Sequence, residues 1–277
     1  MKDGLYRNIG IGDMSFKVPS CWNALTVEQL RFLAGLLESE RTSFEVCLMM
    51  LLKCIGGRIV RVSEEERAVL ISLKGNRFMM DVEQASDLAA TQSYLFDDVY
   101  IPGPHITSAL TVNQFPEIRR GGVVLTGPAD GMLEIPFGRY IWLQTYLSGV
   151  RADAGNLNLA LASLWHSSTE GDEPTDEDAS VISSLPAWQR MVMFWYVSGC
   201  LSRIQRLFPR VFSGGGGGGG NVLDQQLRLL DSLAGSDMTK KDQVRKGRLI
   251  DALYVIDESM RKHEELEREM NNRNRHK

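Results

Sequence analysis

Residues 186–212 read PAWQRMVMFWYVSGCLSRIQRLFPRVF, and the rest of the chain is interpreted around them. From Trp188 to Phe208, apolar residues occupy every side of a helical wheel. A helix that is apolar all round is normally enclosed by neighbouring elements. Its longest uncharged span, residues 191–202, is shorter than the roughly 20 residues needed to cross a bilayer. The stretch therefore predicts a buried central helix.

Composition indicates an ordinary globular protein. The chain has 277 residues, of which 43% are hydrophobic and 24% charged. Its formal net charge of −4 argues against non-specific nucleic-acid binding as the main task, because that task needs a basic face. Residues 1–16 lack the continuous apolar core of a signal peptide, which predicts a cytoplasmic protein.

The N-terminal part predicts two helices, a small β-hairpin and a third helix. Capping boxes at Thr26–Gln29 and Thr42–Glu45 open the first two helices, and Asp81–Gln84 opens the third. Between the second and third helices lie short apolar or β-branched runs, with a turn at residues 74–76. We expect an extended lead-in over residues 5–25.

The middle of the chain predicts two loops around two short helices. Residues 97–135 are punctuated by glycine and proline, and residues 123–126 read as the only clear strand within that long irregular loop. Helices are expected to begin near Phe137 and Leu157. Residues 167–180 hold six acidic residues and no basic ones, which predicts an acidic mobile loop; a calcium loop is disfavoured because the D-x-D-x-D-G spacing is missing.

The C-terminal part predicts a separate helical extension. Seven glycines, residues 214–220, behave as a flexible coil spanning about 15 Å. After them we expect a helical hairpin, with Thr239 capping a long final helix that carries an apolar stripe. The predicted organisation is an α-rich domain over residues 1–212 with a minor β-hairpin, a linker over residues 213–221 and a C-terminal helical extension over residues 222–277.

The sequence contains no recognisable catalytic centre, cofactor motif or metal site. The glycine run lacks the strand, lysine and hydroxyl of a P-loop, and there is no G-x-S-x-G elbow. Four cysteines and four histidines show no zinc-ligand spacing. We therefore expect a non-enzymatic protein without a cofactor.

Several stretches in order resemble tail-region proteins encoded by phages and prophages of gut bacteria. They are LTVNQFPEI (110–118), LTGPADG (125–131), IPFGRY (135–140), LALASLW (159–165) and FPRVF (208–212). The general plan is also similar to tail assembly chaperones of long-tailed phages, which bind the tape-measure protein and help recruit tail-tube subunits. The resemblance implies a role in tail or virion assembly in the host cytoplasm, with other phage proteins or a second copy of the chain as partners.

Seven apolar residues are the candidate partner-binding residues. They are Leu223, Leu227, Leu230, Leu249, Leu253, Ile256 and the loop residue Phe115. The six in the extension form either the seam of the hairpin or a groove for a partner helix.

Three alternatives to an assembly role remain open. A structural virion component, such as a connector or tail-completion protein, would stay in the finished particle. An enzyme predicts an enclosed polar pocket that contains several of Asp130, His105, His166 and Arg139. A nucleic-acid-binding regulator would use the basic residues of the extension, which are Lys240, Lys241, Arg245, Lys246 and Arg248.

Overall fold

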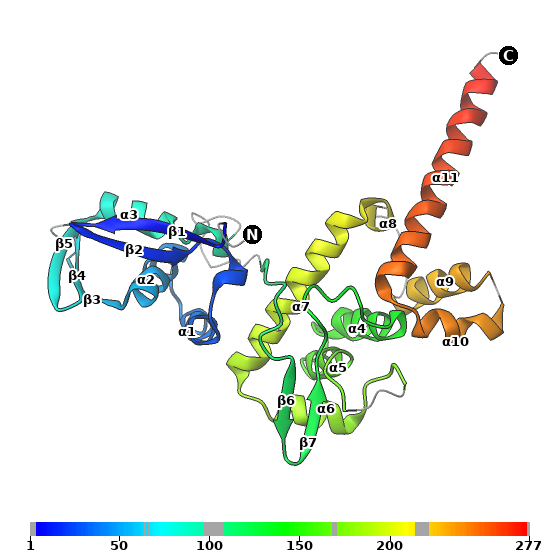
Figure 1. Cartoon of the computed structure of the whole chain (residues 1–277), viewed down its shortest axis with the longest axis horizontal. Helices are drawn as coiled ribbons and strands as arrows, with labels where there is room; N and C mark the ends of the chain where they lie inside the picture. Colours follow the sequence, from blue (N-terminus) through cyan, green and yellow to red (C-terminus); the bar gives the residue numbers. More distant parts are fainter. Residues whose placement is uncertain are drawn as a thin grey trace. The chain divides into compact units, whose positions relative to one another are not determined.

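The computed structural model describes residues 4–63, 65, 67–96, 108–167, 171–213, 222–235 and 237–275. Within them the chain is mainly α-helical with small antiparallel sheets (Figure 1). It forms two compact units, one of Met1–Gln114 with Pro186–Gly199 and one of Phe115–Leu185 with Cys200–Lys277. The sequence analysis expected the boundary between the main domain and the C-terminal extension at the glycine run. In the structure, residues 222–275 instead belong to the same unit as residues 115–185.

The first unit holds the hairpin, the helical pair and the meander of the N-terminal part. Its elements are β1 (Tyr6–Ile11), β2 (Met14–Pro19), α1 (Val27–Leu37), α2 (Ser43–Ile55), β3 (Gly57–Ser63), β4 (Ala68–Leu73), β5 (Asn76–Asp81) and α3 (Val82–Ala90), with short 3₁₀ turns at Trp22–Ala24 and Ser93–Leu95. The expected lead-in is a two-stranded hairpin. The expected small hairpin is confirmed as β4–β5, with positive φ at Lys74 and Gly75, and β3 extends it to a three-stranded sheet.

The two predicted capping boxes are confirmed, and the predicted cap at Asp81 forms a capping box as well. The side chains of Thr26, Thr42 and Asp81 each accept a hydrogen bond from the backbone N–H of the residue three positions later. The side chain of that later residue accepts a hydrogen bond from the backbone N–H of the cap residue. Helix α2 ends as expected at Gly56, whose φ of +73° suits glycine. Local sequence therefore sets these helix ends.

Helix α7 (Ala187–Leu207) supplies residues to both units. Its side chains are buried on all sides from Val192 to Cys200, except for half-buried Phe194 and Ser198, whereas Met191 is exposed. The prediction of a buried helix is thus confirmed for its central part. In the first unit Trp195 meets Trp22 edge-to-face, with ring centroids 5.5 Å apart.

The second unit is built from short helices and one hairpin. Its further elements are β6 (Glu117–Arg120), β7 (Val123–Thr126), α4 (Phe137–Gly149), α5 (Asn156–Ala162), α6 (Asp176–Ser183), α8 (Pro209–Ser213), α9 (Val222–Ala234), α10 (Met238–Lys246) and α11 (Leu249–Arg275). Helices α4, α9 and α10 pack against one another, and α11 packs against α8 and α4.

The long irregular loop is partly ordered. Residues 117–126 form the hairpin β6–β7, in which buried Ile118 stands opposite buried Leu125. The strand at 123–126 is confirmed, but its partner was missed because EIRR is too polar to stand out as a strand. Residues 97–107 lie outside the described residues.

The interpretation of residues 167–180 as a mobile loop is wrong for residues 176–180. Residues 176–183 form α6, in which Thr175 caps the N–H of Asp178 at 3.1 Å. The three acidic residues of its first turn favour the helix, since they face the positive end of its dipole. Buried Ile182 anchors α6, while residues 168–170 lie outside the described residues.

The predicted single final helix is two helices. Asp237, rather than Thr239, caps α10, which ends at Lys246. Residues 247–250 then pair with residues 133–137 in an extended manner: Leu249 N donates to Ile135 O and Phe137 N to Gly247 O, both at 2.8 Å. These long-range bonds replace helical ones and separate α10 from α11.

Candidate partner-binding surfaces

Most of the predicted partner-binding residues are enclosed by the chain itself. Leu230, Leu249, Leu253 and Ile256 are buried, and they lie on α9 and α11 of the second unit. Leu227 is exposed and Phe115 half-buried, while the side chain of Leu223 lies outside the described part. The backbone carbonyl of Phe115 accepts a 2.6 Å hydrogen bond from Trp165 Nε1. In this arrangement the four buried residues belong to the core.

A charged contact also holds the C-terminal helices within the second unit. The guanidinium of Arg245 on α10 binds both carboxylate oxygens of Asp172, at 2.6 and 2.8 Å. This bidentate geometry is the strongest form of such a pair. Through it α10 is tied to the segment before α6, which supports burial of the apolar stripe.

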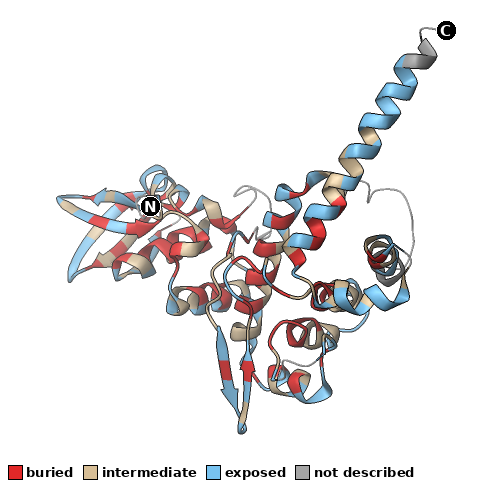
Figure 2. Cartoon of the chain, turned by 45° about the vertical axis from the view of Figure 1, so that its right-hand side comes forward, coloured by how far each residue is buried: buried red, intermediate tan, exposed pale blue. Residues whose placement is uncertain are grey.

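The outer part of α11 has a different character. In the outer segment of α11, defined as residues 262–272, every side chain is exposed except that of half-buried Glu264 (Figure 2). The segment continues beyond α8, whose Arg210 reaches Asp257 at 3.2 Å and Glu264 at 3.7 Å. A helix this poorly packed depends on local pairs such as Arg261–Glu265 at 2.7 Å and His263–Glu267 at 3.3 Å.

The outer segment carries an exposed apolar stripe of its own. Leu266 is 59% exposed and Met270 64%, and Val255, three turns earlier, is 55% exposed. At 3.6 residues per turn, these three side chains fall within about 60° of one another around α11. They lie roughly 100° away from the buried stripe of Leu249, Leu253 and Ile256. This second stripe was missed because the sequence interpretation followed the first stripe, which ends near Met260.

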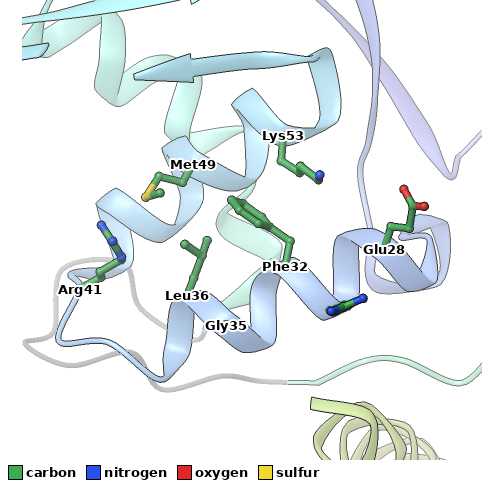
Figure 3. Close-up of a pocket in the computed structure, with 8 residues that line it drawn as sticks. Glu28, Phe32, Gly35, Leu36, Arg41, Met49 and Lys53 are labelled. Carbon is green, nitrogen blue, oxygen red and sulfur yellow. The ribbon is translucent and has the colours of Figure 1, made fainter. Parts of the chain in front are cut away.

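A second open surface lies between α1 and α2 of the first unit. We call it the α1–α2 groove; its open cavity of about 670 Å³ is lined by Glu28, Arg31, Phe32, Gly35, Leu36, Arg41, Met49 and Lys53. A smaller cavity of about 300 Å³ shares Phe32, Met49 and Lys53 with it and adds Arg58. In Figure 3, Phe32 and Leu36 point toward Met49 between the helices, with Arg41 at one end and Lys53 toward the other.

The cations of this groove form no ion pairs within the described residues. Lys53 Nζ stands 5.4 Å from the centroid of the Phe32 ring, and Arg31 Cζ the same distance from the Trp188 ring. Arg41 Nε is shielded from solvent without a hydrogen-bond partner. The groove thus combines an apolar floor with unneutralised positive charge, a combination that the sequence interpretation did not detect.

Two of the four residues that an enzyme was expected to gather, Arg139 and His166, make contacts within the second unit. Arg139 is buried and donates to the backbone carbonyls of Ser163 and Gly171, at 3.4 and 3.0 Å. Burial lowers the pKa of Arg139, against the opposing influence of Asp172 and Asp178. His166 pairs through its backbone with Thr126, and His105 lies outside the described residues. Across the described ranges, no group of three or more metal-ligating side chains lies together.

Four of the five basic residues of the extension lie close to carboxylates. Lys240, Lys241, Arg245 and Arg248 each reach a carboxylate, at 3.5, 2.7, 2.6 and 2.8 Å respectively, whereas Lys246 is exposed. The charge of the four paired residues is therefore partly compensated locally, which reduces the attraction that they offer to phosphate groups.

In the part of the chain that the structure describes, no helix has the length and apolarity to cross a membrane. Comparisons with protein-family models, curated proteins and solved structures found no match. The functional argument accordingly depends on the two open surfaces: the outer segment of α11 and the α1–α2 groove.

Proposed function

We propose that this chain is a non-enzymatic binding protein that acts during phage tail or virion assembly and uses the outer segment of α11 to hold a partner helix. One observation carries the proposal: a helix continues past its packing neighbours with Leu266 and Met270 exposed one turn apart. Exposed apolar residues at helical spacing are typical of helix-in-groove recognition.

The glycine-linked extension is part of the same proposal. Helix α9 packs on α10, and residues 214–220 precede α9 in the chain. The linker that the sequence predicts there would let the C-terminal helices engage one partner while the rest of the chain holds another, which raises the effective concentration of the two partners. The ordered set of phage-like stretches supports tail or virion assembly in the host cytoplasm, with tape-measure-like or other structural proteins as partners.

A capture experiment tests the binding role. Full-length protein is used as bait in a lysate in which virions are being assembled, and the captured proteins are identified by mass spectrometry. We expect a long helical tape-measure-like protein or tail-tube subunits. The variant Leu266→Gln/Met270→Gln keeps good helix formers on α11 but removes the stripe, so its capture should fall by about tenfold or more.

The matched control is Met238→Gln, which removes an equally exposed methionine, 73% accessible, from α10. The control should capture partners like the unmodified chain. Equal capture by all three proteins would remove α11 as the binding element. Mass spectrometry of purified virions then separates an assembly factor, which leaves the particle, from a structural component, which stays.

A further inference from the structure

Gly35 of α1 faces a space that no described residue fills. It is exposed, lines the α1–α2 groove, and a Cβ built on it would meet no neighbouring atom of the described residues within 4 Å. Glycine inside a helix is less stable than alanine, and one use that offsets this cost is the close approach of another backbone. Gly35 therefore marks a place where the backbone of a partner can come close to α1.

Arg41 has a buried donor that the chain leaves unused. Its Nε atom is shielded from solvent and finds no hydrogen-bond acceptor among the described residues. A buried N–H without an acceptor destabilises the folded state, and more so when the group is charged. The Arg41 side chain lines the groove at one end (Figure 3), so an acceptor that a ligand brings into the groove would satisfy this N–H.

Lys53 places a second cation toward the other end of the groove. It lies in the last turn of α2, and Arg41 precedes that helix by two residues, so their backbones are at least ~15 Å apart along α2. Arg31 and Arg58 add positive charge to the lining of the two cavities. Within the described residues none of these four cations forms an ion pair.

The carboxylates near the groove are engaged elsewhere or stand outside it. Glu28 is the carboxylate of the lining, at the end away from Arg41 (Figure 3). Glu45 Oε2 accepts hydrogen bonds from the N–H and the hydroxyl of Thr42, at 2.8 and 3.0 Å. The glutamates at 38 and 40, between α1 and α2, are exposed and do not line the groove. The cations of the groove thus remain open to the carboxylates of a partner.

The apolar floor indicates which kind of anion the groove suits. Phe32 and Met49 are half-buried, and with buried Leu36 they form an apolar surface between the helices. An inorganic anion would leave this surface in water. A nucleic acid needs ring faces on which its bases stack, and Phe32 is the aromatic residue of this lining, with Lys53 Nζ already 5.4 Å from its ring centroid. Two packed helices instead present ridges and grooves into which a third helix packs.

We propose that the α1–α2 groove binds a helix of a partner protein whose apolar stripe is flanked by glutamate or aspartate. The stripe covers the apolar floor, and the partner's backbone comes closest at Gly35. One carboxylate accepts from Arg41, and another, about three turns along the partner helix, lies near Lys53. This site does not rest on the proposed function, because α11 takes no part in it.

A labelled synthetic helix of about 18 residues, added to the full-length chain, is the probe. It carries leucines in one stripe, glutamates on both sides of the stripe and alanine elsewhere, and fluorescence anisotropy measures its binding. We expect saturable binding of this Glu/Leu peptide. A peptide with lysine in place of glutamate, and another with alanine in place of leucine, should each bind about tenfold more weakly or worse.

Three variants of the chain locate the contact. Arg41→Gln/Lys53→Gln should weaken binding of the Glu/Leu peptide by about tenfold or more. Its control, Arg61→Gln/Arg77→Gln, removes two exposed arginines of β3 and β5 outside the groove lining and should leave affinity within about twofold. Gly35→Leu fills the place of closest approach and should also weaken binding by about tenfold or more.

Stability measurements show whether lost binding reflects a lost site or a lost fold. Arg41→Met keeps an aliphatic stem but removes the unused donor, so its melting temperature should equal or exceed that of the unmodified chain while its affinity falls. Gly35→Leu should melt no lower than the unmodified chain, because the space beside Gly35 is open. A variant that binds weakly and also melts lower would contradict this assignment of Gly35 or Arg41.

Three results overturn the inference: no saturable binding of the Glu/Leu peptide, equal binding of the lysine peptide, or equal affinity in the Arg41/Lys53 variant and its control. A single-stranded oligonucleotide that binds more tightly than the peptide, and is lost in the same variant, overturns it in favour of nucleic acid. The stripe variant Leu266→Gln/Met270→Gln should bind the peptide like the unmodified chain. If that variant loses partner capture from the lysate but keeps the peptide, the two sites are separate, and each proposal stands or fails alone.

Discussion

Two tryptophans of the second unit differ in whether the indole N–H donates a hydrogen bond. Trp165 is fully buried and donates to Phe115 O, whereas Trp142 Nε1 is buried without a partner and its ring stacks on Tyr146. Trp165→Phe removes the donor that bonds the half-buried carbonyl of Phe115 and opens a cavity in the core, so we expect a loss of about 2–4 kcal/mol in the free energy of unfolding. Trp142→Phe removes a donor that bonds nothing and should cost less than about 1 kcal/mol.

Urea denaturation of the two variants measures this difference. Equal losses of unfolding free energy in the two variants would mean that the hydrogen bond to Phe115 contributes nothing to stability beyond the packing of the ring.

Burial governs the chemistry of Cys47. Its thiol is inaccessible, and burial raises its pKa to about 12 from an ordinary 9.0. As pH rises, the thiol therefore ionises in the unfolded chain before it ionises in the folded chain. This ionisation lowers the free energy of unfolding. The contribution of Cys47 to stability is complete below pH 9 and is lost as pH rises from about 9 to about 12.

Denaturation curves at successive alkaline pH values test this, because Cys47→Ala should lose less stability over that range than the unmodified chain. Thiol labelling gives a second readout: half-buried Cys21 should react in the native state and Cys47 only after unfolding. Rapid native labelling of Cys47 would contradict the burial argument.

At the scale of elements, two helical glycines differ in what surrounds them. A Cβ on Gly199 of α7 would stand 2.3 Å from the backbone oxygen of Leu110, while a Cβ on Gly35 of α1 meets nothing within 4 Å. Gly199→Ala must therefore displace backbone of the first unit, and we expect a loss of about 2 kcal/mol or more. Gly35→Ala should instead stabilise the chain by about 0.5–1 kcal/mol.

Relative to the unmodified chain, the melting temperature should fall for Gly199→Ala and rise for Gly35→Ala. A neutral Gly199→Ala would show that the segment around Leu110 moves aside without cost.

At the scale of the whole molecule, the proposed function places partner binding on the exposed apolar stripe of Leu266 and Met270. Salt screens attraction between exposed charges, whereas it does not weaken the burial of apolar surface. Capture of partners by the full-length chain should therefore persist when sodium chloride is added to the lysate. Loss of capture on adding salt would indicate that exposed charges, rather than the stripe, hold the partner.

Sequence reasoning succeeded where structure depends on neighbours a few residues apart. The capping boxes at Thr26, Thr42 and Asp81 place donor and acceptor within four residues, so the sequence was enough to locate three helix starts. It failed for α6 because the acidic composition suggested disorder, although Thr175 and the first-turn carboxylates are a local helix signal. The α1–α2 groove was missed because no local pattern shows which face of a helix pair stays open.

The sequence by itself determined the mainly α-helical class, the buried centre of α7 and the turn between β4 and β5, because each depends on residue type and short-range spacing. Only the tertiary structure decided that the final helix breaks at Gly247 and that the stripe of Leu249, Leu253 and Ile256 faces the interior. The break depends on residues 133–137, more than a hundred positions away, whose carbonyls and N–H groups compete with those of a continuous helix. The burial of the stripe depends on the packing of α11 against α4, α8 and α9. The local sequence offers only Gly247 as a signal of the break, and the folded chain supplies the long-range partners that complete it.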